Sequence, residues 1–270
     1  MDDIRILIVI VIYKQAVGES RSYNLFNSLK QDILIIDNSP ESGNKTAINS
    51  VDYISFPDNP GLSKAYNVAA EYAKKNGYDW ILLADQDTRF DDDIIDKLKK
   101  ASRRHPDIKL FCPFIVAGDK LMSPVPLNNY FTKLENIGFI EETWLDIRKT
   151  AIINSGMFIN VNAFLKAGGY NEDVFLDYSD FNFLVRFGKL YNKAICIDSV
   201  AHQEFSNQVQ TISQKLNRFK LFCQSVRHFE SRTFFDKTMI NALVIKRLAS
   251  LIFHCKSTRP LSIYLKNYIL

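Results

Sequence analysis

Asp85 and Asp87 stand one residue apart, directly after the apolar run Ile81–Ala84. Two acids on one turn can hold a divalent cation. Mg²⁺ typically takes one or two carboxylates and leaves its other positions to water and phosphate oxygens. A solvated turn is the bland alternative, because Asp is common in turns. The apolar run in front of the pair indicates the exit of a buried strand, which favours a binding site.

The elements that would position this pair follow from apolar runs and turn signals. Strands are expected at Ile4–Tyr13, Asp32–Ile36, Tyr53–Phe56, Trp80–Ala84 and Leu110–Phe114. Helices are expected at Arg21–Lys30, at Lys64–Asn76 with Ser63 as its cap, and at Asp91–Arg104. Strands that alternate with helices predict an α/β fold with a doubly wound, largely parallel sheet flanked by helices.

In such sheets, ligands sit at the carboxyl ends of the strands. Asp37 ends the second expected strand, and Asp85 and Asp87 follow the fourth. The sequence therefore predicts that these three carboxylates face one crevice.

The second half of the chain has a weaker pattern. Residues 115–150 lack a clear period and are expected to form a loop and hairpin region, and Ala151–Asn160 is a strand-like run broken by Asn154-Ser155-Gly156. Helices are expected at Asn162–Ala167 and Tyr178–Leu190, and a strand at Lys193–Ile197. No internal repeat is present.

Composition narrows the class of protein. The chain has 270 residues, of which 47% are hydrophobic, which suits a globular α/β domain with a full core. Its four cysteines form no CxxC pair, which argues against zinc and a disulfide scaffold and suits a reducing cytosol. Acidic Asp2 and Asp3 precede the first apolar run, which is far shorter than a bilayer span needs, so we expect neither a signal peptide nor a membrane span there.

Charge is distributed unevenly along the chain. Residues 213–270 carry 11 Lys or Arg and two acids, a net charge of +9, whereas residues 1–212 have a net charge of −5. This asymmetry predicts a body at 1–212 and a basic helical extension at 213–270. The extension is rich in Leu, Ile and Val around Lys246 and Arg247, which favours an anionic membrane surface over nucleic acid as its partner.

One other enzyme class also places D-x-D after a strand. Phosphatases of the haloacid-dehalogenase type use D-x-D-x-T with a nucleophilic first Asp, but Thr88 comes one residue too early for that pattern. The chain also lacks GxGxxG, P-loop and GxSxG motifs. Bound phosphates would therefore be held by metal and positive groups.

Several further blocks resemble family 2 glycosyltransferases of the GT-A fold, and most closely their bacterial rhamnosyltransferase-like branch, over roughly Ile4 to Arg227. VIVIYKQ, with Tyr13, resembles the family's opening strand and turn. IIDNSPES resembles the family's V-V-D-N-x-S, whose Asp contacts the nucleotide base, so the resemblance implies that Asp37 contacts the base. FPDNPGLSKAYNVA is similar to N-x-G-x-x-x-x-x-N, carried by Asn59, Gly61 and Asn67. LLADQDT is close to L-D-Q-D-S, whose acids bind ribose and metal.

The block from Asn154 to Arg186 resembles the family segment that carries the general base. Asp180 lies six residues before Arg186, the family's spacing, so the resemblance implies that Asp180 is the base. Ser155 and Gly156 fall at positions expected to contact the sugar, and His202 at the position of a metal-binding histidine beside Asp85 and Asp87.

The resemblance implies an inverting, metal-dependent transferase that uses Mn²⁺ or Mg²⁺. The branch implies a dTDP-L-rhamnose donor and a lipid-linked or polysaccharide acceptor in cell-surface glycan synthesis such as O-antigen or capsule, at the inner face of the cytoplasmic membrane. A UDP-hexose donor is the alternative. Ser179 and Asn182 depart from the family's acidic residues, so a non-catalytic nucleotide- or glycan-binding relative also stays open.

Overall fold

A computed structural model describes residues 4–40, 51–127, 135–203, 211–231 and 233–270. Its first strands are β1 (Ile6–Ile12), β2 (Asp32–Asp37), β3 (Asp52–Ser55) and β4 (Trp80–Asp85), and the main later ones are β6 (Leu110–Ala117), β11 (Phe158–Asn160) and β12 (Lys193–Gln203). Shorter strands are β5 (Thr88–Phe90), β7 (Lys120–Ser123), β8 (Val125–Pro126), β9 (Thr143–Asp146) and β10 (Thr150–Ala151).

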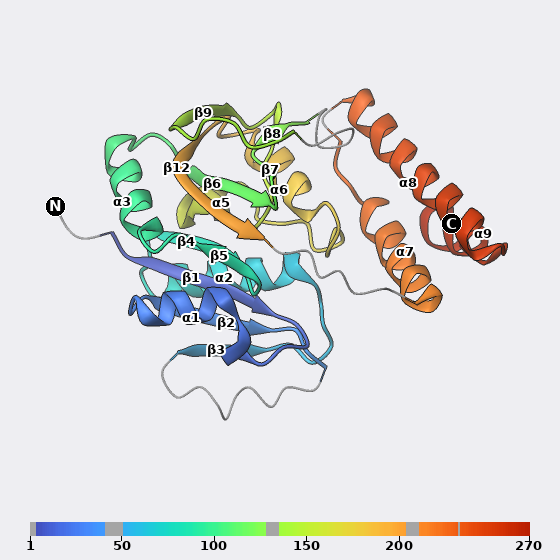
Figure 1. The fold of residues 1–270 in the computed structure, drawn as a ribbon, viewed down its shortest axis with the longest axis horizontal. Helices are drawn as coiled ribbons and strands as arrows, with labels where there is room; N and C mark the ends of the chain where they lie inside the picture. The colour runs from blue at the N-terminus through green and yellow to red at the C-terminus, as the bar shows by residue number, and fades with distance from the viewer. Residues whose placement is uncertain (1–3, 41–50, 128–134, 204–210, 232) are drawn as a thin grey trace.

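The central sheet runs in the order β3-β2-β1-β4-β11-β6-β12-β5. β3, β2, β1 and β4 pair in parallel, as do β6 and β12, whereas β11 and β5 pair antiparallel with their neighbours. Every residue of β1 is buried, because helices cover both faces of the sheet. The predicted α/β architecture is confirmed (Figure 1).

Two helical layers enclose the sheet. α1 (Arg21–Ser28) and α3 (Ile94–Arg104) contribute Phe26, Ile94 and Leu98 to the core on one face. α2 (Leu62–Lys75), α5 (Val161–Lys166) and α6 (Ser179–Phe187) contribute Tyr66, Phe164 and Phe183 to the core on the other. A short 3₁₀ turn, η1 (Val17–Glu19), precedes α1.

Several predicted boundaries are wrong. Ser63 does not cap α2: Gly61 is the N-cap residue, and the Ser63 hydroxyl donates to the Val174 carbonyl at 2.6 Å. α3 begins at Ile94 rather than Asp91. The strand expected at Lys193–Ile197 continues to Gln203, because the end of β12 pairs with β5.

The C-terminal region is helical, as the sequence predicts. It contains α7 (Ile212–Val226), α8 (Phe234–Cys255), α9 (Arg259–Tyr264) and the π-helical turn η3 (Leu265–Ile269). These elements gather at one end of the molecule (Figure 1). They form a small core of their own around Phe222, Val226, Ile240 and Val244, and Tyr178 from the body packs against it.

Candidate active site

The ends of three parallel strands meet at one edge of the sheet. Ile12 pairs with Asp37, and Val11 pairs with Asp85. The strand order reverses at this place, since β1 lies between β2 and β4. Such switch points are where open α/β sheets bind ligands. The structure therefore brings Asp37 and Asp85 to the same edge, as expected.

Gln86, between the two acids, fastens the turn that carries them. Its side chain accepts from the Tyr13 amide at 2.8 Å and donates to the Tyr13 carbonyl at 3.4 Å. The Gln86 carbonyl accepts from the Ser20 hydroxyl at 2.9 Å. The end of β1 and the start of α1 thus hold the Asp85–Asp87 turn in place.

Asp85 is partly buried, and its carboxyl has a pKa raised to about 6. Desolvation is the main cause, and the negative charge of Asp87 adds to it. Gln203 opposes this shift with a hydrogen bond to Asp85 Oδ2 at 3.1 Å. The Tyr66 hydroxyl also lowers the pKa of Asp85, although it has no hydrogen bond of ordinary geometry to any described residue.

Ser155 and Gly156 pack against the turn that carries Asp85 and Asp87. The Ser155 hydroxyl accepts from the Asp85 amide at 3.2 Å and lies 2.8 Å from the Thr88 hydroxyl. Gly156 has φ of +85°, and a Cβ there would come within 2.7 Å of Pro113 Cδ. Both residues are buried and shape the Asp85 turn. Their predicted contact with a sugar stays a prediction.

Asp37 is fully buried. Its Oδ2 accepts from the Tyr53 hydroxyl at 2.8 Å, and its Oδ1 accepts from the Ser39 amide at 2.9 Å. These bonds hold the carboxylate in place at the end of β2. Its role toward a nucleotide base stays a prediction.

Gly61 and Asn67 attach α2 to the segment that leads to Asp180. The Leu62 amide donates to the Phe175 carbonyl at 2.8 Å, at a point where Gly61, with φ of +93°, lets the chains approach closely. Asn67 donates to the Tyr170 carbonyl at 3.0 Å and accepts from the Tyr170 amide at 2.8 Å. Asn59 lies exposed in the preceding loop with φ of +47°.

Asp180 lies in the first turn of α6, where the helix dipole favours a carboxylate. It does not cap the helix. Tyr178 is the N-cap residue, and Asp180 Oδ1 instead accepts from the Phe181 amide at 2.9 Å. The pKa of Asp180 is raised to about 7, mainly by burial. The hydrogen bond from Phe181 opposes this rise, and the charges of Asp85 and Asp177 add to it. Because the charge of Asp85 acts on Asp180, the two carboxylates lie in the same region of the molecule.

Buried polar side chains lie beside Asp85 and Asp180. The pKa values of Tyr66 and Tyr170 are raised mainly by burial, and both hydroxyls also sense the two carboxylates. The Tyr170 hydroxyl donates to Asn154 Oδ1 at 2.6 Å, and Asn154 Nδ2 donates to the Ser179 hydroxyl at 3.3 Å. These two hydrogen bonds link Tyr170 in the core to Ser179 at the start of α6.

Several buried side-chain atoms of the described residues near these carboxylates have no hydrogen-bond partner. Within the described ranges they belong to Asn38, Tyr66, Asp177 and Asn182. Each is a neighbour, in sequence or in space, of Asp37, Asp85 or Asp180. Because buried polar groups are normally paired, these atoms mark positions where a water molecule or a ligand would complete the hydrogen bonding.

His202 lies on the opposite side of β12 from the residue that contacts Asp85. His202 pairs with Arg89 and is exposed, whereas Gln203 pairs with Thr88. Side chains alternate along a strand, so Gln203, not His202, reaches Asp85. Over the described part of the chain, no group of three or more His, Cys, Asp or Glu is placed to hold a metal. The structure therefore does not join His202 to the acid pair.

Sequence reasoning missed Gln203, Tyr66 and Asn154. Gln203, the residue that contacts Asp85, directly follows His202, the residue that was predicted to lie beside the acid pair. Tyr66 and Asn154 carry no signal of their own, because a buried Tyr in a helix and an Asn in a turn are ordinary features. Arg186, six residues after Asp180, forms an ion pair with Glu230 at 2.6 Å.

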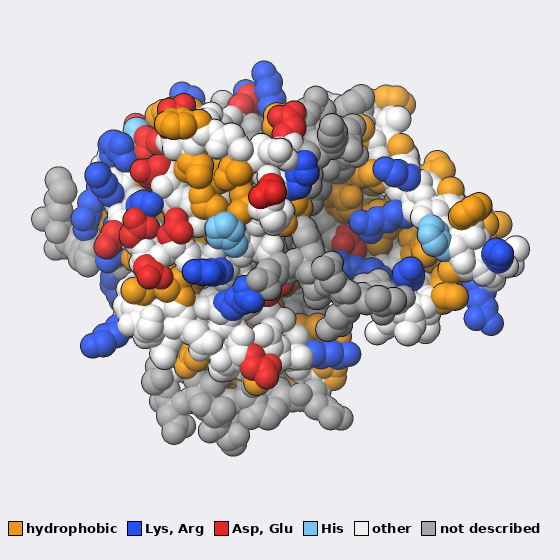
Figure 2. All heavy atoms as spheres, in the orientation of Figure 1, with side chains coloured by type: hydrophobic (Ala, Val, Ile, Leu, Met, Phe, Trp, Pro, Cys, Tyr) orange, Lys and Arg blue, Asp and Glu red, His pale blue; other side chains and the backbone are white. Residues whose placement is uncertain are grey.

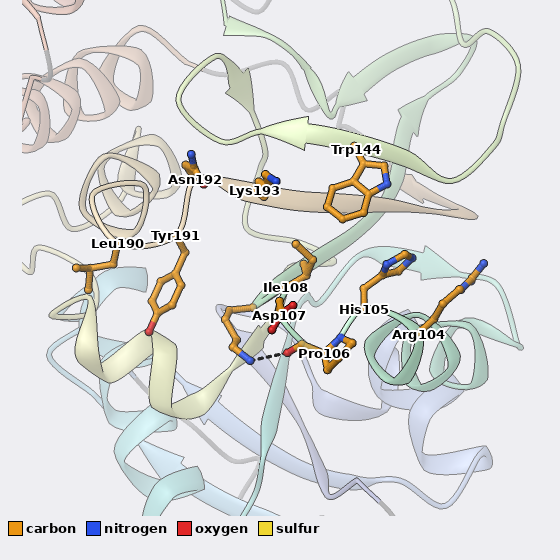
Figure 3. A pocket seen from close by; sticks show the side chains of 11 residues that line it. Arg104, His105, Pro106, Asp107, Ile108, Trp144, Leu190, Tyr191, Asn192 and Lys193 are labelled. Atoms are coloured by element: carbon orange, nitrogen blue, oxygen red, sulfur yellow. Dashed lines mark hydrogen bonds between the residues drawn. The ribbon is translucent and has the colours of Figure 1, made fainter.

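A separate recess lies elsewhere on the molecule. It has a volume of about 370 Å³ and is lined by the end of α3, by Trp144 of β9 and by the start of β12 (Figure 3). Arg104 and His105 border it, and both pair with Glu142. Its lining includes none of the carboxylates of the crevice, so we do not assign the active site there.

Comparison with known proteins decides the family. Residues 8–167, more than half of the chain, match the family described as Glycosyl transferase family 2. The chain belongs to this family. The match includes Asp37, Asp85 and Asp87 but ends before Asp180 and His202.

This family 2 glycosyltransferase has a relative among curated proteins, the dTDP-rhamnosyl transferase RfbF of Shigella flexneri. The two are 26% identical over 185 residues, 66% of this chain and 61% of that protein. The chain thus spans about three fifths of the length of this relative. The likeness supports the rhamnosyltransferase-like branch within the family.

Solved structures confirm the GT-A fold. S. aureus TarS 1–349 in complex with UDP-GlcNAc matches with a TM-score of 0.57 at 9% identity, covering 98% of this chain and 79% of that one. The complex of the same fragment with UDP matches with a TM-score of 0.54 at 10% identity, covering 92% and 72%. At such identities the likeness concerns the fold alone.

Proposed function

We propose that this protein transfers a sugar from a nucleotide-diphosphate donor to an acceptor hydroxyl with inversion at the anomeric carbon. The observation that carries the proposal is Asp180, a partly buried carboxylate whose pKa is raised to about 7 and on which the charge of Asp85 acts. A base with a pKa near the working pH removes a proton most effectively. The family assignment supports the reaction class and removes the reason to consider a phosphatase.

In this mechanism, Asp180 accepts the proton of the acceptor hydroxyl. The hydroxyl oxygen forms its bond to the anomeric carbon from the face opposite the donor's diphosphate. The bond between that carbon and the diphosphate oxygen breaks, and its electron pair leaves with the nucleoside diphosphate. One direct displacement of this kind inverts the configuration at the anomeric carbon.

On the donor side, Asp37 binds the nucleotide base and Asp85 the ribose. Tyr13, Asn59, Gly61, Asn67, Ser155 and Gly156 form or support the donor pocket. Asn67 and Gly61 act through the loop that they hold, since their contacts run to Tyr170 and Phe175.

The acid pair fits a divalent cation. Asp87 raises the pKa of Asp85, so the two carboxylates repel each other across a short turn, and a bound cation would relieve this repulsion. Asp85 and Asp87 would hold Mn²⁺ or Mg²⁺, with water and diphosphate oxygens completing the shell. Such an ion stabilises the negative charge of the departing diphosphate. His202 is a further ligand only if the end of β12 rearranges.

For the donor, we propose dTDP-L-rhamnose, supported by the likeness to RfbF. UDP-hexoses are the alternative. Thermal-shift titration with dTDP-rhamnose, UDP-glucose and UDP-GlcNAc in Mn²⁺ separates them, because a bound ligand stabilises by RT ln(1 + [L]/Kd). A larger shift with either UDP-sugar than with dTDP-rhamnose would contradict the donor assignment.

A turnover assay with the donor that this titration identifies tests the non-catalytic alternative. Its motive is that Ser179 and Asn182 replace acidic residues. Ser179 has a structural partner in Asn154, and Asp180 itself is retained. Turnover of the stabilising donor with a lipid-linked glycan acceptor supports an enzyme, whereas donor binding with no release of nucleoside diphosphate would support a binding protein.

We further propose that the acceptor is lipid-linked and that the C-terminal region lies on the anionic inner face of the cytoplasmic membrane. α8 exposes Phe253 and Ile245, and Lys246 and Arg247 of the same helix are exposed as well. Hydrophobic and basic side chains mingle on this lobe, at the right of Figure 2. Such a surface suits an interfacial helix.

Residues Asp236–Cys255 of α8 are also long and apolar enough to cross a membrane, judged by length and composition, and only 17% of the apolar window is buried. Two features favour a surface position. Lys246 and Arg247 stand near the middle of this segment, where a spanning helix would carry charge at large cost. Ile240, Val244 and Leu248 already pack against α7 and its neighbours.

A further inference from the structure

Helix α7 of the C-terminal region holds Asp177, three residues before Asp180. Arg218 Nη2 lies 2.9 Å from Asp177 Oδ1 and forms an ion pair with it. The Ser225 hydroxyl donates to the Asp177 carbonyl at 3.0 Å. One helix thus fixes both the side chain and the backbone of Asp177.

The next residue, Tyr178, is held from the same side. Its backbone is left-handed, with φ of +64° and ψ of +16°, which is uncommon for a residue with a large side chain. Its ring packs against Phe222 of α7, with centroids 5.8 Å apart, and against Phe181 of α6 at 5.7 Å. Such a conformation persists when surrounding contacts enforce it, and here α7 supplies one of them.

The rest of the segment is anchored on two sides. Glu230, after α7, pairs with Arg186 of α6 at 2.6 Å and with Lys189 at 3.5 Å. Asn171 donates to the His228 carbonyl at 3.2 Å. From the other side, α2 binds Phe175, Val174 and Tyr170. Residues 170–180 are therefore clamped between α2 and the C-terminal region.

We propose that Arg218 is a positioning residue for Asp180, so that the C-terminal helices form part of the catalytic unit. The ion pair of Arg218 with Asp177 fixes the start of α6. It also neutralises the charge of Asp177, which is the charged residue nearest to Asp180 in the sequence. The inference rests on the proposed role of Asp180 as the base. It assigns residues 213–270 a task in the reaction besides membrane binding.

The charges around Asp180 give the inference a measurable consequence, a change in the pKa of Asp180. Asp85 and Asp177 both raise the pKa of Asp180, and the buried hydroxyls of Tyr66 and Tyr170 lie beside it. Arg218 compensates the charge of Asp177. Loss of Arg218 would leave that charge uncompensated and raise the pKa of Asp180, whereas loss of the Asp177 charge would lower it.

The test compares Arg218→Met, Arg218→Lys and Asp177→Asn in the full-length protein, with detergent-solubilised acceptor. We expect Arg218→Met to lower kcat about tenfold, since misplacement of a reacting group costs up to about 10²-fold. The acidic limb of its kcat/KM profile should move up by about half a pH unit, and that of Asp177→Asn should move down. Arg218→Lys should restore the position of the limb. The KM for the donor should stay unchanged.

Arg104→Met is the matched control. The ion pair of Arg104 with Glu142 is also 2.9 Å long, and the Arg104 and Arg218 side chains are both 51% exposed. Arg104 lies at the recess of Figure 3, apart from the crevice. This variant should match the wild type in kcat and in pH profile. If it reproduces the Arg218→Met profile, the effect is general and the inference is wrong.

Other outcomes are equally decisive. If Arg218→Met keeps the wild-type kcat and profile while Asp180→Asn is inactive, the positioning role is wrong and the proposed function stands. If Asp180→Asn is fully active, the proposed base itself is wrong. If Arg218→Met fails to fold, its pH profile cannot be measured. In that case, wild-type kcat/KM profiles in both Arg218→Lys and Asp177→Asn would overturn the inference.

Discussion

The side-chain amide of Gln203 donates a hydrogen bond of 3.1 Å to Asp85, a residue 118 positions earlier in the chain. This bond joins the end of β12 to the end of β4. It stabilises the charged form of a carboxylate whose pKa is raised by burial and by the charge of Asp87. The surroundings of Asp85 are thus assembled from both halves of the sheet.

Replacement of the proposed base should separate chemistry from binding. Asp180→Asn keeps the size of the side chain and an oxygen that can accept from Phe181, but it cannot take up a proton. We expect turnover to fall about 10²–10⁴-fold with nearly unchanged donor affinity. Asp87→Asn should weaken donor and metal binding along with turnover. Single-turnover assays and donor titrations on both variants make the comparison, and near-normal turnover in Asp180→Asn would move the base elsewhere, with Asp177 next.

The pH dependence of the reaction should reveal Asp180. The base works only when ionised, and burial raises its pKa to about 7. At saturating Mn²⁺, kcat/KM should therefore rise roughly tenfold per pH unit below about pH 7 and level off above it. A profile that is flat from about pH 5 to about pH 8 would be incompatible with this assignment.

Donor binding should require a divalent cation. The motive is the pair Asp85 and Asp87, whose repulsion a cation would relieve. EDTA should abolish both donor-induced stabilisation and turnover, and Mn²⁺ should restore them. Asp87→Asn should lose the response to Mn²⁺. His202→Ala tests the predicted third ligand: loss of the response to Mn²⁺ would support His202 as a ligand, whereas a wild-type response would exclude it. Undiminished activity in EDTA would exclude a required metal.

Gly156→Ala should destabilise the fold near the acid pair. The new Cβ would approach Pro113 Cδ to 2.7 Å, at a φ of +85° that only glycine adopts freely. We expect a loss of about 1–3 kcal/mol in the free energy of unfolding, measured by denaturant titration. Gly138→Ala is the control, because nothing lies within 4 Å of its Cβ position and its φ is not positive. Equal stability of the two variants would refute the packing argument.

Binding to anionic vesicles should depend on exposed apolar residues of α8. Phe253 is 81% exposed, so Phe253→Ser should weaken binding with little effect on folding. Phe139, 86% exposed on the body, provides the control Phe139→Ser. Added salt should weaken binding, since charges are screened within about 8 Å at physiological ionic strength. Cosedimentation that is equal for both variants and insensitive to salt would argue against this surface.

The sequence by itself determined the sheet and the acid pair. Apolar runs such as Ile6–Ile12 are buried on both faces and so read as central strands, and strand ends place Asp37 and Asp85 at one edge in any parallel arrangement. The resemblance of the block Asn154–Arg186 to a family segment marked Asp180 as the expected base, and this role stays a prediction. These features are local, because each depends on residues close together in the chain.

Only the tertiary structure decided which distant groups act on these carboxylates. One position of register on β12 exchanges His202 for Gln203 beside Asp85, because neighbouring side chains in a strand point to opposite faces. Likewise, a helix more than 30 residues beyond Asp180 brings Arg218 to Asp177. Desolvation by packing, which no short motif encodes, then raises the pKa of Asp180 toward neutrality.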